Sequence, residues 1–243
     1  MGFGVPLATP PRRVVSLVPS LTEAIAVSAP SVLVGATDYC AFTAGLDPPR
    51  VGGTKYPDLS RVRALAPDLV VANAEENRES DVAALRSAGV PVWVTYPRTV
   101  DSAFLSLERL LAVFGVAPAW LAEARAAWAP RFVGIRRRAV VPVWRRPWVV
   151  LGSSTFAGDV LARLGIDNVY ASSPERYPRP PLDELRAAGA DLVVLPDEPY
   201  AFTASDGPES FPGMPYALVS GRLLTWYGPS LATARTALSA ALG

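Results

Sequence analysis

Short apolar runs alternate with stretches of helical periodicity along most of the chain. Runs such as Arg13–Val18 and Asp68–Ala72 are short and largely apolar, which is typical of strands buried on both faces of a parallel sheet. Stretches such as Leu59–Leu65 and Leu182–Ala188 carry apolar residues at helical spacing. This alternation predicts an α/β fold in which parallel-rich sheets are flanked by helices.

The alternating elements fall into two blocks. In the first block, we expect strands at 13–18, 32–35, 68–72 and 90–95 and helices at 21–28, 59–65 and 80–88. In the second block, we expect strands at 148–152, 168–170, 191–195, 217–220 and 223–226 and helices at 156–164, 182–188 and 230–241. Ser20, followed by Glu23, predicts an N-cap and capping box for the first helix.

The stretch Asp101–Arg138, between the blocks, is the longest one with helical periodicity. Gly115 divides it, and Pro118 suits the first turn of a second helix, Ala119–Arg138. Because Pro130 lies inside that second helix, we expect a kink or an early end near Ala129.

One motif occurs in both blocks. Leu59-x-x-Val62-Arg63-Ala64, followed by Asp68-Leu69-Val70-Val71, returns 123 residues later as Leu182-x-x-Leu185-Arg186-Ala187, followed by Asp191-Leu192-Val193-Val194. The fixed spacing indicates two similar lobes, each with its own sheet. We therefore predict an N-terminal α/β lobe at 1–100, linking helices at 101–140 and a C-terminal α/β lobe at 141–243. The loops that follow the strands would then face a ligand cleft between the lobes.

The composition narrows the classes of function. The chain of 243 residues has no histidine and one cysteine, Cys40, so His-based acid–base catalysis, Ser-His and Cys-His pairs and His metal ligands are excluded. The net charge of +1 argues against nucleic acid as a partner. No apolar run reaches the roughly 18 residues of a transmembrane helix, so we expect no membrane insertion. Because Met1–Arg13 lacks a signal-peptide pattern, we expect a cytoplasmic protein, or an extracytoplasmic one if a leader has been removed.

The loops after the predicted strands are rich in aromatic and hydroxyl side chains. Flat aromatic faces with polar tips suit a large, partly apolar, ring-shaped ligand. The candidate ligand-binding residues are Pro19, Ser20, Asp38, Tyr39, Asn73, Glu76, Ser154, Phe156, Tyr177, Tyr200, Trp226 and Tyr227. We predict no catalytic residue and no metal ligand among them.

Several other features allow two interpretations. Glu75-Glu76 is either a cation site or the solvated start of a helix, and we favour the helix start. Cys40 is either a soft-metal thiolate or a buried inert thiol, and we favour the buried thiol. The basic run Arg136–Arg138 is interpreted as a solvated linker face rather than a phosphate patch. The run Val51–Thr54 lacks the Lys-Ser/Thr of a phosphate loop, which excludes nucleotide hydrolysis.

An ordered set of segments resembles a known family. The segments Arg13–Glu23, Val34-Gly35 with Asp38-Tyr39, Pro57–Leu59 and Pro67–Val70 resemble the class III solute-binding proteins. The most similar members are the vitamin B12-binding proteins of ABC importers, in the helical backbone metal receptor group. The resemblance covers nearly the whole chain. It implies two α/β lobes joined by one long helix, Ala119–Arg138 here, with the ligand between the lobes and little hinge motion.

The resemblance also assigns roles to single residues. Tyr39 takes the place of a tyrosine that lies against the corrin ring, Tyr177 takes that of a tryptophan in the second lobe, and Trp226 lies close to a C-terminal tryptophan. Two further tryptophans of the B12 binders are replaced here by Thr54 and Asn73.

Permease docking in this family uses one acid on each lobe. Asp183 is the matching acid of the second lobe. In the first lobe the matching position is Ser60, for which Asp58 is a nearby substitute.

We therefore expect a monomeric, non-catalytic binding protein for a corrinoid (cobalamin-like) or related metal-chelate ligand, without a required cofactor. One alternative is a ferric-siderophore or haem receptor of an ABC importer, with the permease as its partner. Another alternative is an enzyme or scaffold that reuses the fold, with chemistry at Glu76, Asp38, Tyr39 or Cys40.

Overall fold

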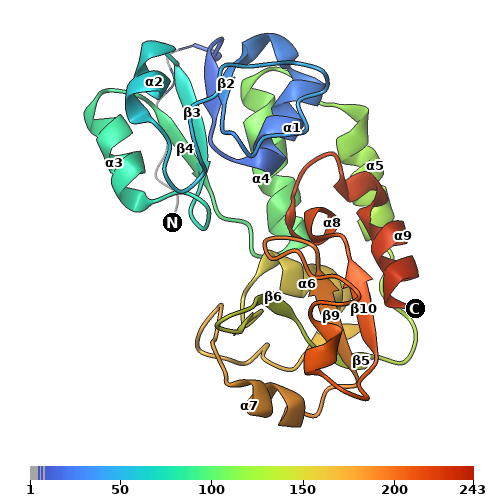
Figure 1. Ribbon diagram of the computed structural model, residues 1–243. Coiled ribbons are helices and arrows are strands. Elements are labelled where there is room, and N and C mark those ends of the chain that lie inside the picture. Colours follow the sequence, from blue (N-terminus) through green and yellow to red (C-terminus); the bar gives the residue numbers. More distant parts are fainter. Residues whose placement is uncertain (1–4, 6, 8) are drawn as a thin grey trace. The chain divides into compact units, whose positions relative to one another are not determined.

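The computed structural model describes residues 5, 7 and 9–243 (Figure 1). The described chain divides into two compact units, and each unit draws on separate parts of the sequence. Unit 1 contains the described residues up to Tyr96, Ala103–Leu121 and Tyr227–Pro229, whereas unit 2 contains Pro97–Ser102, Ala122–Trp226 and Ser230–Gly243. The continuous ranges 1–100, 101–140 and 141–243 stay a prediction of how the chain is organised.

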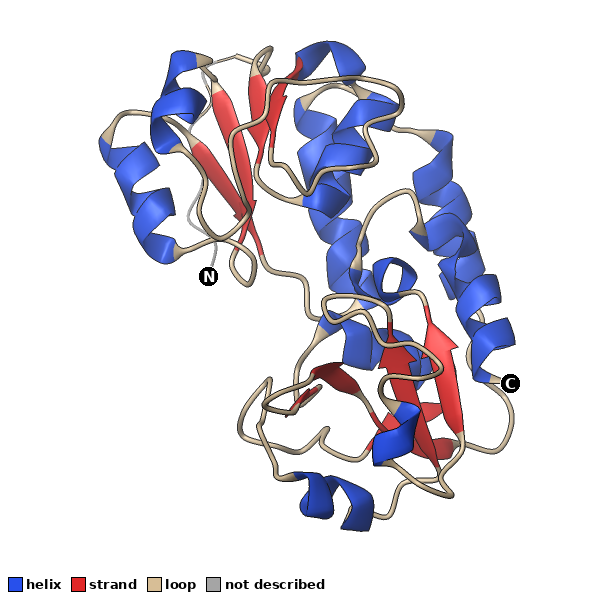
Figure 2. Ribbon diagram, viewed as in Figure 1, coloured by secondary structure: helices blue, strands red, loops and turns tan. Residues whose placement is uncertain are grey.

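Unit 1 is built on a four-stranded parallel sheet (Figure 2). Its strands are β1 (Val14–Ser16), β2 (Leu33–Ala36), β3 (Leu69–Asn73) and β4 (Val92–Thr95), in the order β2-β1-β3-β4. Its connecting helices are α1 (Pro19–Ser28), the short 3-10 helix η1 (Pro30–Val32), α2 (Leu59–Ala64) and α3 (Glu79–Ser87).

The core of unit 1 follows from the alternation of side chains along the strands. Val15, Val70 and Val92 share one cluster of buried residues with Val62 of α2 and Leu85 of α3, so these two helices cover one face of the sheet. The opposite face is covered by α1 and by helix α4 (Val100–Val113) (Figure 1). Burial on both faces explains why these strands are apolar at nearly every position.

Unit 2 is built on a second four-stranded parallel sheet with an antiparallel pair beside it. The sheet contains β5 (Arg137–Val140), β8 (Ile166–Asn168), β9 (Leu192–Pro196) and β10 (Tyr216–Val219), in the order β10-β9-β5-β8, and the pair is β6 (Pro142–Trp144) with β7 (Val149–Val150). The helices are α6 (Phe156–Arg163), α7 (Leu182–Ala187), the 3-10 helix η2 (Pro208–Ser210), α8 (Gly221–Thr225) and α9 (Leu231–Leu242). Val140, Val193 and Leu195 share a buried cluster with Leu185 of α7, whereas α6 contacts β8 and α9 contacts β10.

The two sheets repeat one topology. Read from β8, the second sheet has the order β8-β5-β9-β10, which matches β2-β1-β3-β4 strand for strand in chain order. The repeated motif occupies equivalent elements, because α7 and β9 lie 123 residues after α2 and β3 (Leu59 to Leu182, Leu69 to Leu192). The predicted α/β fold, with a parallel sheet in each half, is therefore confirmed.

The long second helix predicted over Ala119–Arg138 is wrong. Helix α5 (Ala119–Trp128) ends before Pro130, as the expected early end near Ala129 required, because proline cannot continue the backbone hydrogen bonds. Phe132, inside the predicted helix range, lies in the loop that follows α5. The helical periodicity before Gly115 is realised by α4, which begins in unit 2 and continues into unit 1.

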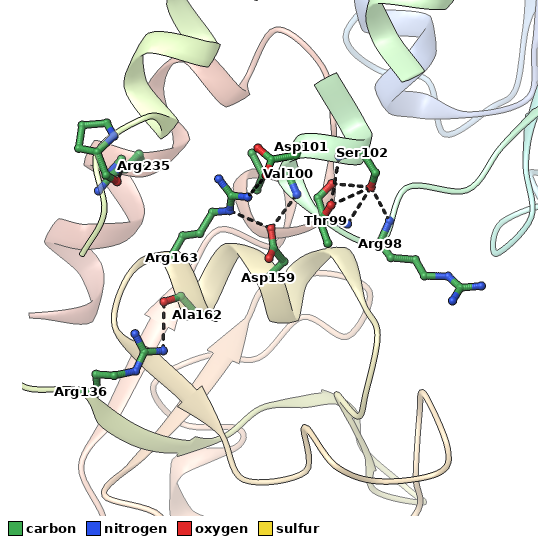
Figure 3. Close-up of polar contacts among 11 residues, drawn as sticks. Arg98, Thr99, Val100, Asp101, Ser102, Arg136, Asp159, Ala162, Arg163 and Arg235 are labelled. Carbon is green, nitrogen blue, oxygen red and sulfur yellow. Dashed lines mark hydrogen bonds and ion pairs between the residues drawn. The ribbon is translucent and has the colours of Figure 1, made fainter. Parts of the chain in front are cut away.

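The start of α4 is fixed by side chains on both sides of its first turn. The Thr99 hydroxyl accepts from the Ser102 backbone N–H (3.1 Å), and the Ser102 hydroxyl accepts from the Thr99 backbone N–H (2.9 Å) (Figure 3). Asp159 of α6 accepts from the Val100 N–H (2.7 Å), and Arg163 bridges Asp159 and Asp101. These contacts satisfy N–H groups that have no partner inside the helix.

Four further predictions need correction. Helix α1 begins at Pro19, with Val18 as its N-cap, so Ser20 is not a capping residue; the fixed φ of proline suits this first position. The basic run is not only a solvated face, because Arg137-Arg138 opens the interior strand β5. The first strand of the second sheet is therefore β5, and not the predicted strand at 148–152, where β7 pairs with β6. The stretch predicted as a strand at 223–226 belongs largely to helix α8, and the edge strand is β10.

Candidate ligand-binding site

A buried polar cluster in unit 1 joins the candidate residues Asn73 and Tyr227 with the neighbouring Thr95. Asn73, at the end of β3, donates from its side-chain amide to the Tyr227 hydroxyl at 2.6 Å. Thr95, at the end of β4, lies 2.8 Å from the same hydroxyl and donates to the Ala72 carbonyl at 3.0 Å. Burial raises the pKa of the Tyr227 phenol, and the nearby carboxylate of Glu76 raises it further. The phenol therefore stays protonated and serves as a hydrogen-bonding anchor.

The loop after β3 is shaped by its own asparagines. The Asn73 side-chain carbonyl accepts the backbone N–H groups of Glu75 (2.7 Å) and Glu76 (3.3 Å). Asn77 accepts from the Asn73 backbone N–H (2.8 Å) and donates to the carbonyls of Leu17 (3.2 Å) and Thr54 (2.9 Å). Asparagines favour such local turns because their short side chains reach nearby backbone groups. The result is a fixed position for Glu76.

Glu76 is the most perturbed acid near this cluster. Burial raises its pKa to about 7, the neighbouring Glu75 raises it as well, and Lys55 opposes the rise. Part of the residue surface remains exposed, but the carboxyl group itself is densely surrounded. The interpretation of Glu75-Glu76 as a helix start is wrong, because α3 begins only at Glu79. A carboxyl group with this pKa changes its charge near neutral pH.

Pro19 and Ser20 lie at the start of α1, where another backbone segment approaches closely. A Cβ atom on Gly228 would lie 2.8 Å from the Ser20 carbonyl oxygen. Only glycine allows this distance, so Gly228 places Tyr227 beside the Asn73 amide. The structure thus brings Ser20, Asn73, Glu76 and Tyr227 together in unit 1.

Asp38 and Tyr39 occupy a separate loop of unit 1. Tyr39 is 68% exposed, and its ring faces Gly53, whose Cβ position lies 3.5 Å from the ring edge. Cys40 is fully buried next to the hydroxyls of Thr22 (3.0 Å) and Thr37 (3.1 Å), and burial raises the pKa of its thiol. This environment matches the predicted inert thiol, whereas the Tyr39 ring is available for a flat ligand.

Ser154 and Tyr177 lie on two neighbouring loops of unit 2. The backbone N–H of Gly152 donates to the Arg176 carbonyl at 2.8 Å, and that of Ser153 donates to the Glu175 carbonyl at 3.4 Å. Ser154 has a φ of +52°, an uncommon backbone conformation for a side-chain-bearing residue, and is exposed together with Tyr177. Phe156 differs from both, because it is buried at the start of α6.

Tyr200 and Trp226 lie in two further environments of unit 2. The Tyr200 ring packs against Trp144 and Phe202, and its hydroxyl donates to Asp206 at 2.6 Å. Trp226 is partly buried and stacks with the guanidinium of Arg222, 5.4 Å from the ring centre. Of the candidates in unit 2, Phe156 and Tyr200 have the clearest packing role. Ligand contact stays a prediction for every candidate residue.

The two acids predicted for permease docking lie at the starts of equivalent helices, although Ser60 and not Asp58 is the exact counterpart of Asp183. Asp58 is the N-cap of α2, and Asp183 lies in the first turn of α7, the equivalent helix of unit 2. The Ser60 hydroxyl donates to Asp58 at 2.5 Å and thereby lowers the pKa of that carboxyl. Asp183 is almost fully exposed beside Arg186. Both carboxyl groups are accessible to solvent.

Two residues of these environments escaped the sequence reasoning. Thr95 is the last residue of β4. Its position directly before Tyr96, in the loop after that strand, is the sequence signal that could have identified it. Glu198 follows Asp197 in the loop after β9, and desolvation raises the pKa of its carboxyl, as does the charge of Asp197. No group of three or more metal-ligating side chains occurs among the described residues. No helix in the described part of the chain is long and apolar enough to cross a membrane.

Comparison with known proteins supports the family resemblance in sequence and in fold. The vitamin B12-binding protein of Photorhabdus laumondii is 24% identical over 208 residues, which cover 79% of this chain and 74% of that protein. No family model matches the chain.

Solved structures share the fold over nearly the whole chain. The periplasmic haem-binding protein RhuT of Roseiflexus sp. RS-1 matches with a TM-score of 0.76 at 20% identity, covering 95% of this chain and 97% of that one. The periplasmic vitamin B12-binding protein BtuF of Vibrio cholerae matches with a TM-score of 0.70 at 18% identity, covering 96% and 99%. The predicted cytoplasmic location is wrong in the light of these matches, because both solved proteins are periplasmic.

Proposed function

We propose that this chain is a non-catalytic binding protein for a corrinoid or related metal chelate. It is related in sequence to vitamin B12-binding proteins and shares the fold of the class III periplasmic binding proteins. The observation that carries the proposal is the relation to a B12-binding protein over 79% of the chain. We place the protein outside the cytoplasm, where the solved proteins of this fold work.

The chemistry of the chain favours a ligand whose metal is already fully coordinated. The sequence has no histidine, and its one thiol, Cys40, is buried with a raised pKa. A haem iron is usually held by a histidine, cysteine, methionine or tyrosine of the protein. A corrinoid can carry both axial ligands itself, so it needs from the protein only shape, apolar faces and hydrogen bonds.

Haem or a ferric siderophore is the second candidate class. Its support is the match to a haem-binding protein and the exposed phenol of Tyr39, since tyrosine can ligate haem iron. In either case we propose an ABC importer permease as the partner, with Asp58 and Asp183 as the docking acids. Exposed rim charges of this kind chiefly govern association rate and its salt dependence.

Calorimetric titration of the purified protein with cyanocobalamin, dicyanocobinamide, haemin and a ferric siderophore tests the ligand class. We expect the strongest heat with a corrinoid and co-elution of its colour in gel filtration. Tyr39→Ala should weaken the bound complex about tenfold without changing stability, because the ring is largely exposed. Tyr216→Ala, which removes another exposed tyrosine, is the matched control.

Two outcomes decide between the ligand classes. Binding of haemin with a phenolate-to-iron absorption band that disappears in Tyr39→Ala would select haem over the corrinoid. Absence of heat and of co-eluting colour with all of these compounds would rule out the proposed function.

A further inference from the structure

The loop between α5 and β5 exposes branched apolar side chains to solvent. We name residues 129–136 the α5–β5 loop. Val133 is 93% exposed and Ile135 is 92% exposed, more than any other large apolar side chain of the described residues. Single exposed apolar residues are common on protein surfaces. Two almost fully exposed aliphatic side chains within three residues indicate instead a surface that contacts an apolar partner.

The structure holds this loop at both ends. Arg235 of α9 donates to the carbonyls of Ala127 (3.1 Å) and Pro130 (2.7 Å) where the loop begins. Where the loop ends, Arg136 donates to the Ala162 carbonyl (3.1 Å; Figure 3). Arg136 also forms an ion pair with Asp167 (2.5 Å). These anchors fix the backbone, so the outward position of Val133 and Ile135 is not that of a frayed end.

Phe132, in the same loop, is less exposed than Val133 and Ile135. Its ring covers Gly165, where a Cβ atom would lie 2.3 Å from the ring. Phe132 is 37% exposed, so its ring is partly covered, whereas Val133 and Ile135 are almost fully exposed. The hydrophobic effect alone would favour covering all three side chains.

The charges around the loop identify the sign of its partner. Between Glu123 and Asp159 the sequence has seven arginines and no acid, although the whole chain carries a net charge of only +1. Arg131 precedes the exposed pair by two residues and is itself exposed. No ion pair engages Arg131 among the described residues. Arg136, at the end of the loop, is paired with Asp167, and Arg145 is paired with Asp206, so Arg131 is the available cation of the loop. An aliphatic tip beside an available cation is complementary to a surface that is anionic outside and apolar within.

We propose that the α5–β5 loop is a membrane contact, in which Val133 and Ile135 enter the interface of an anionic bilayer and Arg131 binds lipid phosphate. Two side chains are too few for a stable protein–protein interface, which buries about 800 Å² on each partner. Shallow apolar insertion beside an exposed arginine is, in contrast, sufficient for weak and reversible attachment to anionic lipid. This inference is independent of the ligand proposed above.

Vesicle flotation tests the contact directly. We expect the full chain to float with vesicles of phosphatidylcholine and phosphatidylglycerol in a 3:1 ratio at low salt, and to lose most of this binding at high salt or with pure phosphatidylcholine. The double variant Val133→Ser/Ile135→Ser should bind about tenfold more weakly, since each aliphatic group loses its transfer to the interface. Arg131→Gln should reduce binding about fivefold, in line with one phosphate contact.

The matched control is Leu105→Ser, which makes the same kind of change at an aliphatic side chain of α4 that is 55% exposed. It should float like the original protein, and circular dichroism should show all variants folded. A second readout uses Val133→Cys labelled with an environment-sensitive dye; Cys40 is fully buried and should not react. We expect the dye emission to rise and shift to the blue when anionic vesicles are added.

Three results would overturn the proposal. They are no flotation of the original chain with anionic vesicles, unchanged flotation of the double variant, and a dye at position 133 that does not respond to vesicles. Loss of binding to a purified permease in the double variant, without vesicle binding, would also overturn it and would assign the loop to a protein partner.

Discussion

The Asp191 carboxylate accepts the backbone N–H of Arg138 at 2.9 Å, while the Asp191 backbone N–H donates to the Arg138 carbonyl at 2.8 Å. Asp68 and Arg13 exchange the same two bonds in unit 1, at 3.0 Å and 2.9 Å. The aspartate of the repeated motif therefore has one task in both units: it joins the start of the first strand to the segment that enters the third.

Replacing either aspartate should destabilise its unit. We expect Asp191→Ala to lower the free energy of unfolding by about 1 kcal/mol, because it loses one charge-assisted bond to a backbone N–H at an exposed site. Asp68→Ala should lower it by about 1–2 kcal/mol, because Asp68 accepts from the backbone N–H groups of both Arg12 and Arg13. Urea unfolding followed by circular dichroism measures the change. Asp47→Ala, at a highly exposed acid 3.9 Å from Arg50, is the control and should have almost no effect. An equally small effect at Asp191 would contradict the assigned role.

Tyr227→Phe should destabilise the protein more than its small change in size suggests. The variant removes the hydroxyl that accepts from Asn73 and contacts Thr95, and so leaves a buried amide with a weaker partner at 3.4 Å. We expect a loss of about 1–3 kcal/mol in the free energy of unfolding. Tyr216→Phe removes a hydroxyl from an exposed tyrosine and should leave stability unchanged. Equal stabilities of the two variants would exclude an anchoring role for Tyr227.

Glu76 should make stability fall between about pH 4.5 and pH 7. The pKa of its carboxyl is about 7 in the folded protein, above the reference value of 4.5, so in this window the folded state keeps a proton that the unfolded chain has lost. The stabilisation is complete below about pH 4.5 and is lost as pH rises through 7. It amounts to about 2 kcal/mol once the partly exposed position is taken into account.

The variant Glu76→Gln should remove this dependence. We expect it to be more stable than the original protein at pH 8 and to show a smaller difference between pH 5 and pH 8 in chemical unfolding. Glu123→Gln, at an exposed glutamate of α5, should keep the original slope. If both variants keep that slope, the buried carboxyl of Glu76 is not its source.

Gly152→Ala should disrupt the pair of loops that carry Ser154 and Tyr177. A Cβ atom at this position would lie 2.2 Å from the Glu175 carbonyl oxygen and 2.9 Å from that of Arg176, and backbone atoms cannot yield as a flexible side chain does. We expect a loss of about 3 kcal/mol in unfolding free energy. The control Gly53→Ala meets no atom closer than 3.5 Å and should be tolerated. Thermal unfolding of both variants provides the comparison.

The sequence predicted those helices and strands best whose hydrophobic pattern is complete within the element itself. The motif Leu59–Val71 and its copy predicted a helix followed by a buried strand, and both copies form these elements. Strand β5 was missed because it opens with Arg137-Arg138 and the apolar signal lies further along the chain. Helix α8 was mistaken for a strand because a short apolar run does not distinguish the two periodicities.

The candidate site was less accessible, because its geometry depends on contacts between distant residues. Asn73 and Tyr227 were each named from their loops, but the hydrogen bond between them spans 154 positions of the sequence. The pKa of Glu76 depends on the packing of its loop, which residue types alone do not reveal. Phe156 was named as a ligand-binding candidate from its loop, but its side chain is buried in the core.

The contribution of Tyr227–Pro229 to unit 1 bears on how the chain folds as it leaves the ribosome. Most of unit 1 is translated first, but the side chain that accepts the buried Asn73 amide is added only after unit 2 is nearly complete. Until then the amide has only water and the more distant Thr95 hydroxyl (3.4 Å) as partners. The first half of the chain should therefore fold reversibly during most of synthesis. It should reach its full stability only when the last segments of the chain are available.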